Sequence, residues 1–211
     1  MDDIKSRAEN LEMTRQYYEK NADSFFQDTK DLKLDHVYQP FLSLLPAGGR
    51  ILDAGCGSGR DSLYFKNLGF KVTAFDASKK LVELGTSLLG QQVLHLTFEE
   101  ISFEEEFDGI WASASLLHVP GKKMPVILQK LEKALKNGAF FFCSYKYGMG
   151  EKLTRGRLFN FYNESTFSNL IKKYSRLEIV DIKKTEDSRK ERAGEHWLNV
   201  TLRKENKSRK P

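Results

Sequence analysis

Cysteine and proline are scarce in this chain of 211 residues, which has two of the first and five of the second. Cys56 and Cys143 form no CxxC motif, and two cysteines are too few for a disulfide scaffold. Both lie in apolar, strand-like sequence, which indicates buried and inert thiols. The four histidines lie far apart, with neither HxH nor HExxH spacing, so we expect no metal site. These absences exclude a disulfide-rich scaffold and argue against a metalloenzyme.

Long hydrophobic runs are also missing. The longest, residues 139–143, is far shorter than the ~20 residues that span a bilayer. The first residues, Met1–Lys5, are charged and lack the apolar segment of a signal peptide. We therefore expect a cytoplasmic protein without a membrane partner.

Basic residues exceed acidic ones only near the C-terminus. Residues 183–211 contain ten Lys or Arg and five Asp or Glu, which accounts for the whole net charge of +5. The preceding residues contain 24 of each kind and have no net charge. A nucleic-acid-binding face usually needs a broader excess, so this distribution argues against nucleic acid as a partner. Residues 205–211 are expected to form a flexible basic tail.

Hydrophobic residues make up 40% of the chain and charged residues 30%, which is typical of a globular domain. Short apolar segments alternate with segments of helical periodicity, and this predicts an α/β fold with a mainly parallel sheet. We expect one domain over residues 1–204, with a helical cap in residues 1–46 and a core in residues 47–204. The expected strands are residues 50–54, 71–75, 93–97, 107–112, 139–145, 176–183 and 196–203. The expected helices are residues 2–26, 32–45, 61–68, 79–88 and 122–136, the last closed by Asn137-Gly138, and one from Asn163 or Ser165 to Lys173.

The most informative segment is Ile51–Arg60, in which a short apolar strand ends in an acid and turns through three glycines into a helix. These glycines permit a tight turn and let a ligand approach the backbone, at the carboxyl end of the sheet. The dinucleotide motif GxGxxG would need a glycine where Arg60 stands, and Asp53 would put negative charge beside a pyrophosphate. The loop therefore favours a ligand with a cationic group and no pyrophosphate over NAD.

A second acid stands at the end of the next expected strand. Lys71–Phe75 is followed by Asp76, 17 positions after Gly59. The two oxygens of a carboxylate at this place can accept hydrogen bonds from both hydroxyls of a ribose. The glycine loop and Asp76 together predict a nucleoside-binding site.

At this point the sequence resembles the class I S-adenosylmethionine (SAM)-dependent methyltransferases, over roughly residues 14–203. Asp53–Gly59 resembles their first motif and Phe75–Ser78 their second. Phe107–Ala112 with Leu116–Pro120 is similar to their fourth strand and the turn after it, and Leu131–Phe140 to their passage into the fifth strand. Within the family, Gly59–Asp61 and Ser144–Glu151 resemble a tellurite-resistance-type branch.

The resemblance implies a Rossmann-like sheet of seven strands in the order 3-2-1-4-5-7-6, with the last strand antiparallel, helices on both faces and an N-terminal helical lid. It also implies SAM as the cofactor, S-adenosylhomocysteine (SAH) as the product and no metal. Asp53 would orient the ammonium group, the glycine loop would face the methionine part, and Asp76 would hold the ribose. Thr97-Phe98 stands where the family often has an acid for the adenine. The expected cofactor-binding residues are Tyr17, Asp53, Ala54, Gly55, Cys56, Gly57, Gly59, Arg60, Asp76, Ala77, Ser78, Thr97 and Phe98.

For several residues the sequence allows two different roles. His118 is either a general base or a structural or pocket-lining residue. Tyr17 and Tyr18 belong either to a lid over SAM, where a tyrosine hydroxyl reaches the methionine carboxylate, or to core packing. Arg60 either pairs with that carboxylate or faces solvent in the first turn of its helix.

The long connection of residues 146–163 is either a substrate wall, with cations that favour an anionic substrate, or a surface excursion. In the first reading Lys146, Arg157 and Tyr162 bind the substrate, and His118 and Tyr18 are the catalytic candidates.

The leading hypothesis is methyl transfer to a small molecule. An RNA methyltransferase is the second, because the C-terminal segment is basic, although Ala112–Ser115 replaces the (D/N)PP(Y/F) motif used for amino groups of bases. A SAM- or SAH-binding module without transferase activity is the third.

Overall fold

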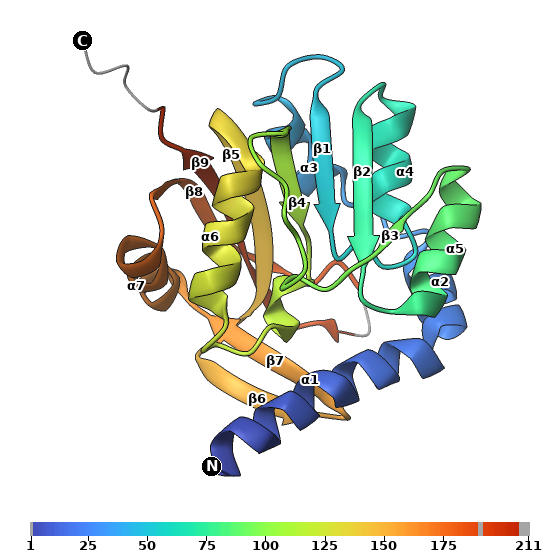
Figure 1. The fold of residues 1–211 in the computed structure, drawn as a ribbon, viewed down its shortest axis with the longest axis vertical. Coiled ribbons are helices and arrows are strands. Elements are labelled where there is room, and N and C mark those ends of the chain that lie inside the picture. Colours follow the sequence, from blue (N-terminus) through green and yellow to red (C-terminus); the bar gives the residue numbers. More distant parts are fainter. Residues whose placement is uncertain (1, 190–191, 207–211) are drawn as a thin grey trace.

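The computed structural model describes residues 2–189 and 192–206, with side chains from residue 10 onward. Most of the expected basic tail, residues 207–211, lies outside the described residues. Figure 1 shows a central twisted sheet with helices on both sides and a long N-terminal helix beneath the ends of the strands. Within the described residues, no helix combines the length and the apolar character needed to cross a membrane.

The sheet confirms the expected order, with a hairpin added to it. Strands β3, β2, β1, β4 and β5 are parallel neighbours, β9 pairs antiparallel with β5, and β8 pairs antiparallel with β9. Because β8 and β9 are the sixth and seventh of the expected strands, this is the order 3-2-1-4-5-7-6 with an antiparallel last strand. The strands are β1 (Arg50–Ala54), β2 (Lys71–Asp76), β3 (Leu94–His95), β4 (Phe107–Ala112), β5 (Leu135–Tyr147), β6 (Gly150–Thr154), β7 (Arg157–Tyr162), β8 (Leu177–Glu186) and β9 (His196–Lys204).

Both faces of the sheet are covered, as the apolar character of its strands requires. Successive residues of a strand point to opposite faces. Leu52 packs in a cluster with residues of α6 and α7, whereas its neighbour Ile51 packs with residues of α3 and α4. The helices are α1 (Asp2–Lys20), α2 (Ala22–Thr29), α3 (Asp35–Leu42), α4 (Arg60–Asn67), α5 (Lys79–Leu89), α6 (Met124–Ala134) and α7 (Glu164–Tyr174), with a 3-10 turn η1 (Leu116–His118).

Three expected helices differ from the structure by more than one residue at an end. The helix expected over residues 32–45 is confined to Asp35–Leu42. The expected helix over residues 2–26 is divided at Asn21, whose side-chain amide donates to the Tyr17 carbonyl at 2.7 Å, so that α1 and α2 are separate. The helix expected to reach Lys136 ends at Ala134. The backbone amides of Glu105 and Glu106 donate to the carbonyls of Lys133 and Ala134, and β5 begins at the next residue.

The connection after β5 contains a β-hairpin, which the sequence pattern of residues 146–163 did not predict. β6 and β7 pair antiparallel around a turn at Arg155-Gly156, where both residues have positive φ, as a tight hairpin turn requires. The end of β7 also pairs parallel with the end of β5. In Figure 1 α1 lies against this hairpin, and the two enclose the space beyond the carboxyl ends of the strands.

Candidate functional site

The glycine loop lies at the carboxyl end of β1, where the sequence predicted it. The amides of Gly55 and Cys56 both donate to the Phe75 carbonyl at 2.9 Å, which fixes the loop against β2. Gly55 has a φ of 75°, and a Cβ added there would lie 2.5 Å from the Cβ of Ser115. Gly59 instead faces Gly85 and Leu89 of α5. The absence of a side chain at Gly55 thus lets the loop approach the turn after β4 closely, whereas its absence at Gly59 lets the chain pack against α5.

Asp76 bridges the end of β2 and the glycine loop. Its Oδ2 accepts a hydrogen bond from the Gly57 amide and its Oδ1 accepts one from the Ser78 amide, each at 2.9 Å. Burial raises the pKa of this carboxyl, and the backbone amides of Ser78, Gly57 and Ala77 oppose that rise. Both oxygens are thereby held in place with lone pairs left for a ligand.

Two further acids lie beneath the loop and differ in their partners. Asp53 is buried and accepts a hydrogen bond from the Ser62 hydroxyl at 2.6 Å. Burial, and then the negative charge of Asp61, raise the pKa of Asp53 above its usual range. A cation beside Asp53 would offset both effects, so this acid is suited to a positively charged ligand group.

Asp61 is a structural acid in this arrangement. It accepts hydrogen bonds from Tyr38 Oη at 2.6 Å, Arg60 Nε at 2.6 Å and Trp111 Nε1 at 2.7 Å. Burial alone would raise its pKa, but the charge and hydrogen bond of Arg60, together with the hydrogen bonds from Tyr38 and Trp111, hold the pKa of Asp61 below its usual value. Arg60 also donates to the Thr29 carbonyl at 3.3 Å, which connects α4 to the end of α2. The charge of Arg60 is therefore already paired.

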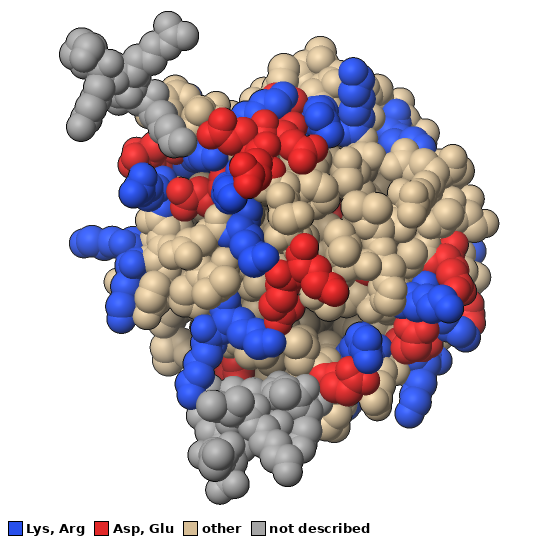
Figure 2. Space-filling view, viewed as in Figure 1, with Lys and Arg blue, Asp and Glu red and all other residues tan. Residues whose placement is uncertain are grey.

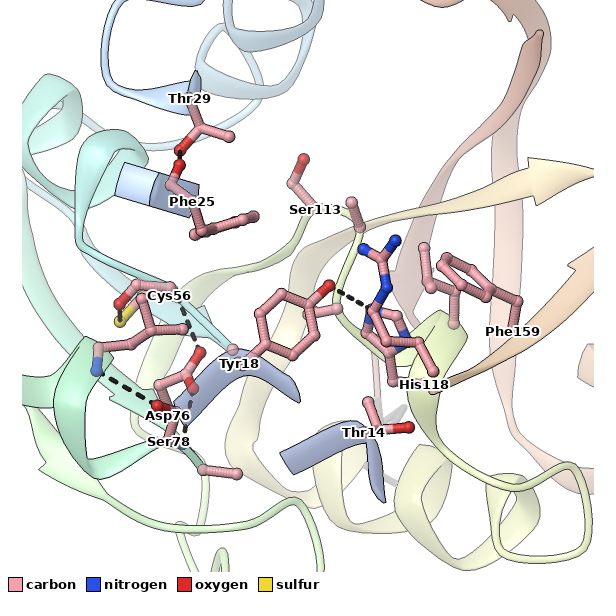
Figure 3. A pocket seen from close by; sticks show the side chains of 18 of the residues that line it. Thr14, Tyr18, Phe25, Thr29, Cys56, Asp76, Ser78, Ser113, His118 and Phe159 are labelled. Carbon is pink, nitrogen blue, oxygen red and sulfur yellow. Dashed lines mark hydrogen bonds between the residues drawn. The ribbon is translucent and has the colours of Figure 1, made fainter. Parts of the chain in front are cut away.

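Helix α1 is attached across the site at several points. Glu19 Oε2 accepts a hydrogen bond from the Ser78 hydroxyl at 2.7 Å, at the N-terminus of α5. Thr14 Oγ1 accepts one from the buried Leu158 amide of β7 at 2.9 Å. Figure 3 shows Tyr18 of this helix between Asp76 and Ser78 on one side and His118 and Phe159 on the other. Sequence reasoning missed Glu19 and Thr14, because both are ordinary polar helix residues whose partners are distant in the chain.

Tyr18 and His118 form a hydrogen-bonded pair. The Tyr18 hydroxyl lies 2.8 Å from His118 Nε2, and His118 Nδ1 lies 2.6 Å from the Leu158 carbonyl oxygen. A carbonyl oxygen only accepts, so we assign the imidazole proton to Nδ1, and Nε2 then accepts from Tyr18. Burial, together with the nearby charge of Arg157, lowers the pKa of His118 to about 4, against the opposing effect of the Leu158 carbonyl. His118 is therefore a neutral imidazole with a fixed tautomer.

These groups open into one cavity of about 920 Å³. That volume lies toward the upper end of the ~300–1,000 Å³ of ligand pockets, which leaves room for a nucleoside and a second molecule. Of the expected site residues, fifteen line it: Tyr17, Tyr18, Asp53, Gly55, Cys56, Gly57, Arg60, Asp76, Ala77, Ser78, Thr97, Phe98, His118, Lys146 and Arg157.

Three expected residues do not line this cavity. Ala54 is a buried residue of β1, and Gly59 packs on α5 as described above. Tyr162 packs edge-on against Tyr145, with ring centroids 4.8 Å apart, and against Phe167 at 5.7 Å. Burial raises the pKa of Tyr162 to about 12. Tyr162 therefore lies outside the main cavity, because the pairing of β7 with β5 turns this residue toward α7.

Lys146 reaches the cavity but is not a free cation. Its ammonium pairs with Asp187 Oδ2 at 3.0 Å and with Glu195, and it lies 4.3 Å from the ring centroid of Trp197. Burial alone would raise the pKa of Asp187, but hydrogen bonds from Arg189, Lys146 and Trp197 place it well below its usual range. An anionic ligand would have to compete with two carboxylates for Lys146. Within residues 2–189 and 192–206, no group of three or more His, Cys, Asp and Glu side chains is arranged to hold a metal ion.

Comparisons with known proteins find that the chain is similar to methyltransferases. Residues 52–143 match a family model described as a methyltransferase domain. The chain is 21% identical over 142 residues to a probable SAM-dependent methyltransferase TehB of Haemophilus influenzae, which covers 65% of this chain and 49% of that protein. It is 35% identical over 108 residues to a ubiquinone biosynthesis O-methyltransferase of Xanthomonas axonopodis pv. citri, covering 48% of this chain and 44% of that protein. The chain thus spans about half the length of these relatives.

A solved structure shows the same fold over most of the chain. The 1,6-didemethyltoxoflavin-N1-methyltransferase of Burkholderia thailandensis, crystallised with 1,6-didemethyltoxoflavin and SAH, superposes with a TM-score of 0.73 at 23% identity. The superposition covers 91% of this chain and 87% of that one. The chain therefore contains a region that matches the methyltransferase domain, and it shares its fold with this solved methyltransferase.

Proposed function

We propose that the protein transfers the methyl group of SAM to a small-molecule acceptor. The observation that carries this proposal is the position of Asp76, whose two carboxylate oxygens are fixed by the amides of Gly57 and Ser78 at the edge of the large cavity. A nucleoside whose ribose hydroxyls meet Asp76 would direct its 5′ substituent toward the glycine loop and Asp53. The raised pKa of Asp53 and the absence of a Cβ at Gly55 both suit the positively charged methionine end of SAM.

The remaining residues would prepare the pocket for transfer. When bound, SAM supplies a methyl group on a positively charged sulfur, and displacement in line with the acceptor atom moves it. Helices α1 and α2 would exclude water from the reacting atoms. Phe98, whose ring contacts Phe75 with centroids 5.2 Å apart, would offer an apolar surface to the adenine.

Tyr18 would stand between the acceptor and His118. Since His118 Nε2 already accepts a hydrogen bond from Tyr18, an acceptor proton would reach His118 only through the Tyr18 hydroxyl. A histidine with a pKa of about 4 is a weak base at neutral pH. These two features favour a positioning role for the pair over strong general-base catalysis.

The charge pattern favours a small acceptor over RNA. Figure 2 shows Lys and Arg side chains interspersed with Asp and Glu on the face it displays, without a continuous basic area there. The basic residues of the C-terminal segment that line the cavity include Arg189, which pairs with Asp187 at 2.8 Å. A tRNA gel shift at several salt concentrations tests this part of the proposal, because RNA binding through phosphates weakens steeply with salt.

The proposal as a whole is tested by calorimetric titration with SAH, with NAD as the competing nucleotide. We expect the wild-type protein to bind SAH in preference to NAD. Asp76→Ala should lose this binding, whereas Asp23→Ala, which removes an exposed acid of α2, should retain it. Binding of NAD instead, or SAH binding that survives Asp76→Ala, would overturn the nucleoside site. Methyl release from SAM over a panel of small acceptors then separates an enzyme from a binding module.

A further inference from the structure

Arg157, the first residue of β7, contains a buried atom without a partner. Its Nε is the single buried side-chain nitrogen or oxygen that lacks a hydrogen-bond partner within the part of the chain that the structure describes. No ion pair of this guanidinium occurs among those residues either. Buried polar groups in proteins are almost always hydrogen-bonded, and an exception needs a physical explanation. Arg157 lines the main cavity, so a ligand there can supply the missing acceptor.

Aromatic rings hold this guanidinium in place. Its Cζ lies 4.2 Å from the ring centroid of Tyr17, 5.1 Å from that of Phe159 and 6.0 Å from that of Tyr18. These contacts are close enough for cation–π attraction. An arginine held in this way is ready to bind a carboxylate with little loss of side-chain freedom. The geometry is that of an anion-binding residue whose anion comes from outside the chain.

The position of Arg157 indicates which ligand it meets. In Figure 3 Tyr18 separates Cys56, Asp76 and Ser78 from His118 and Phe159. Arg157 contacts Phe159, and the next residue of the chain, Leu158, accepts the hydrogen bond from His118. Arg157 therefore lies on the His118 side of Tyr18, away from the acid that would hold the ribose.

We propose that Arg157 binds an anionic oxygen of the methyl acceptor, and that the acceptor is a small organic acid. This inference rests on the proposed function and names the substrate class of the same site. Lys146 is less suited to this role, because Asp187 and Glu195 neutralise it. The methionine carboxylate of SAM carries the same chemistry, so the experiment must distinguish these two sources.

The test compares Arg157→Gln with a matched control, Arg155→Gln. Arg155 lies two residues away in the turn of the hairpin and is exposed, so both variants lose one positive charge from the same segment. Arg157→Lys, which keeps the charge, serves as the second variant if Arg157→Gln folds poorly. Acetate and benzoate are the anionic probes, and acetamide and benzamide are their neutral counterparts. Each is titrated at constant ionic strength, with and without saturating SAH, and binding is followed by the shift in thermal midpoint.

We expect the carboxylates to raise the thermal midpoint of wild type and Arg155→Gln, and the amides to have no such effect. Arg157→Gln should show at least a ten-fold weaker response to the carboxylates. Arg157→Lys should keep part of the response. Carboxylates that stabilise no more than amides, or that act equally on Arg157→Gln, would overturn the inference.

A second measurement identifies the source of the anion. SAH and 5′-methylthioadenosine, which lacks the amino-acid carboxylate, are titrated into each variant. If Arg157 meets the acceptor, both nucleosides bind Arg157→Gln as they bind wild type. A selective loss of SAH affinity would instead assign Arg157 to the methionine carboxylate and overturn the acceptor site. Failure of the wild type to bind SAH would count against the proposed function, while the carboxylate titrations without SAH would still report on Arg157.

Discussion

The hydroxyl of Thr14 in α1 accepts a hydrogen bond from the backbone amide of Leu158 in β7, with 2.9 Å between Oγ1 and N. The carbonyl of the same Leu158 accepts the hydrogen bond of His118. One peptide segment of the hairpin therefore joins the helix that covers the pocket to the imidazole that lines it. Because both groups of Leu158 are satisfied in this way, the position of α1 and the orientation of His118 are linked.

The first prediction concerns this link. Thr14→Val removes the hydroxyl but keeps the volume, so the buried Leu158 amide is left without an acceptor. We expect the free energy of unfolding to fall by about 1–3 kcal/mol, the cost of an unsatisfied buried donor. The affinity for SAH should fall as well, because α1 is less firmly held. Urea denaturation and calorimetry measure the two effects.

Thr14→Ser is the matched control, since it keeps the hydroxyl. It should bind SAH as the wild type does. A Thr14→Val protein that is as stable as Thr14→Ser would show that the Thr14–Leu158 hydrogen bond does not hold α1.

The part of the site around the glycine loop and Asp76 was predictable from the sequence for a physical reason. The glycine loop and Asp76 belong to one βαβ unit, in which a strand, a helix and the next strand follow each other along the chain. Parallel pairing of β1 with β2 then brings Ala54 opposite Phe75, so the loop and the acid must meet. Local sequence determines both the turn and the position of the carboxylate.

The part of the site around His118, Lys146 and Arg157 was not predictable in the same way. The sequence did not show that Lys146 is paired, because its partners Asp187 and Glu195 follow it by 41 and 49 positions. The contact of Glu19 with Ser78, near Asp76, was missed for the same reason, because 59 positions separate the two residues. Such contacts depend on how α1, the β6–β7 hairpin and the segment between β8 and β9 fold over the sheet, and no local pattern encodes them. Arg157 was in the predicted substrate wall, but only the structure shows that its Nε has no partner.

The second prediction concerns the dependence of stability on pH. The pKa of His118 is about 4 in the folded protein, against about 6.5 for an unperturbed histidine. Between these two values the unfolded chain binds a proton that the folded protein does not. The contribution of His118 to stability is therefore present above pH of about 6.5 and is lost as the pH falls toward 4. The slope it adds is at most about 1.4 kcal/mol per pH unit.

The measurement is the difference in free energy of unfolding between wild type and His118→Gln, by urea denaturation from pH 4 to pH 7.5. We expect this difference to change as the pH falls, with wild type losing more. Parallel curves for wild type and His118→Gln would mean that His118 titrates normally in the folded protein.

The third prediction concerns Asp61. Asp61→Asn removes the charge that pairs with Arg60. It also replaces one of the two acceptor oxygens by an NH2 group, so the side chain can no longer accept the hydrogen bonds of both Tyr38 and Trp111. Breaking a buried pair on one side costs about 3–5 kcal/mol, and we expect the lower end because Arg60 is partly exposed. Asp23→Asn, whose side chain is 82% exposed and 4.0 Å from Lys80, should cost less than about 1 kcal/mol. Equal costs for the two variants in urea denaturation would contradict the structural role of Asp61.

The fourth prediction separates backbone strain from steric exclusion at the glycine loop. Gly55 and Gly69 have φ values of 75° and 87°, so alanine at either position pays the cost of the left-handed conformation, about 1–2 kcal/mol. At Gly69 a Cβ would meet nothing within 4 Å, whereas at Gly55 it would lie 2.5 Å from the Cβ of Ser115. Ser115 cannot easily retreat, because its hydroxyl donates to the Ala54 carbonyl at 2.6 Å.

Gly69→Ala should therefore lose only the strain energy in urea denaturation and keep its affinity for SAH. Gly55→Ala should be less stable than Gly69→Ala and should bind SAH at least ten-fold more weakly, since the loop must shift away from β4 to admit the methyl group. If the two variants bind SAH equally well, the loop tolerates a side chain at position 55. The need for glycine there would then lie in the backbone conformation rather than in the close approach to Ser115.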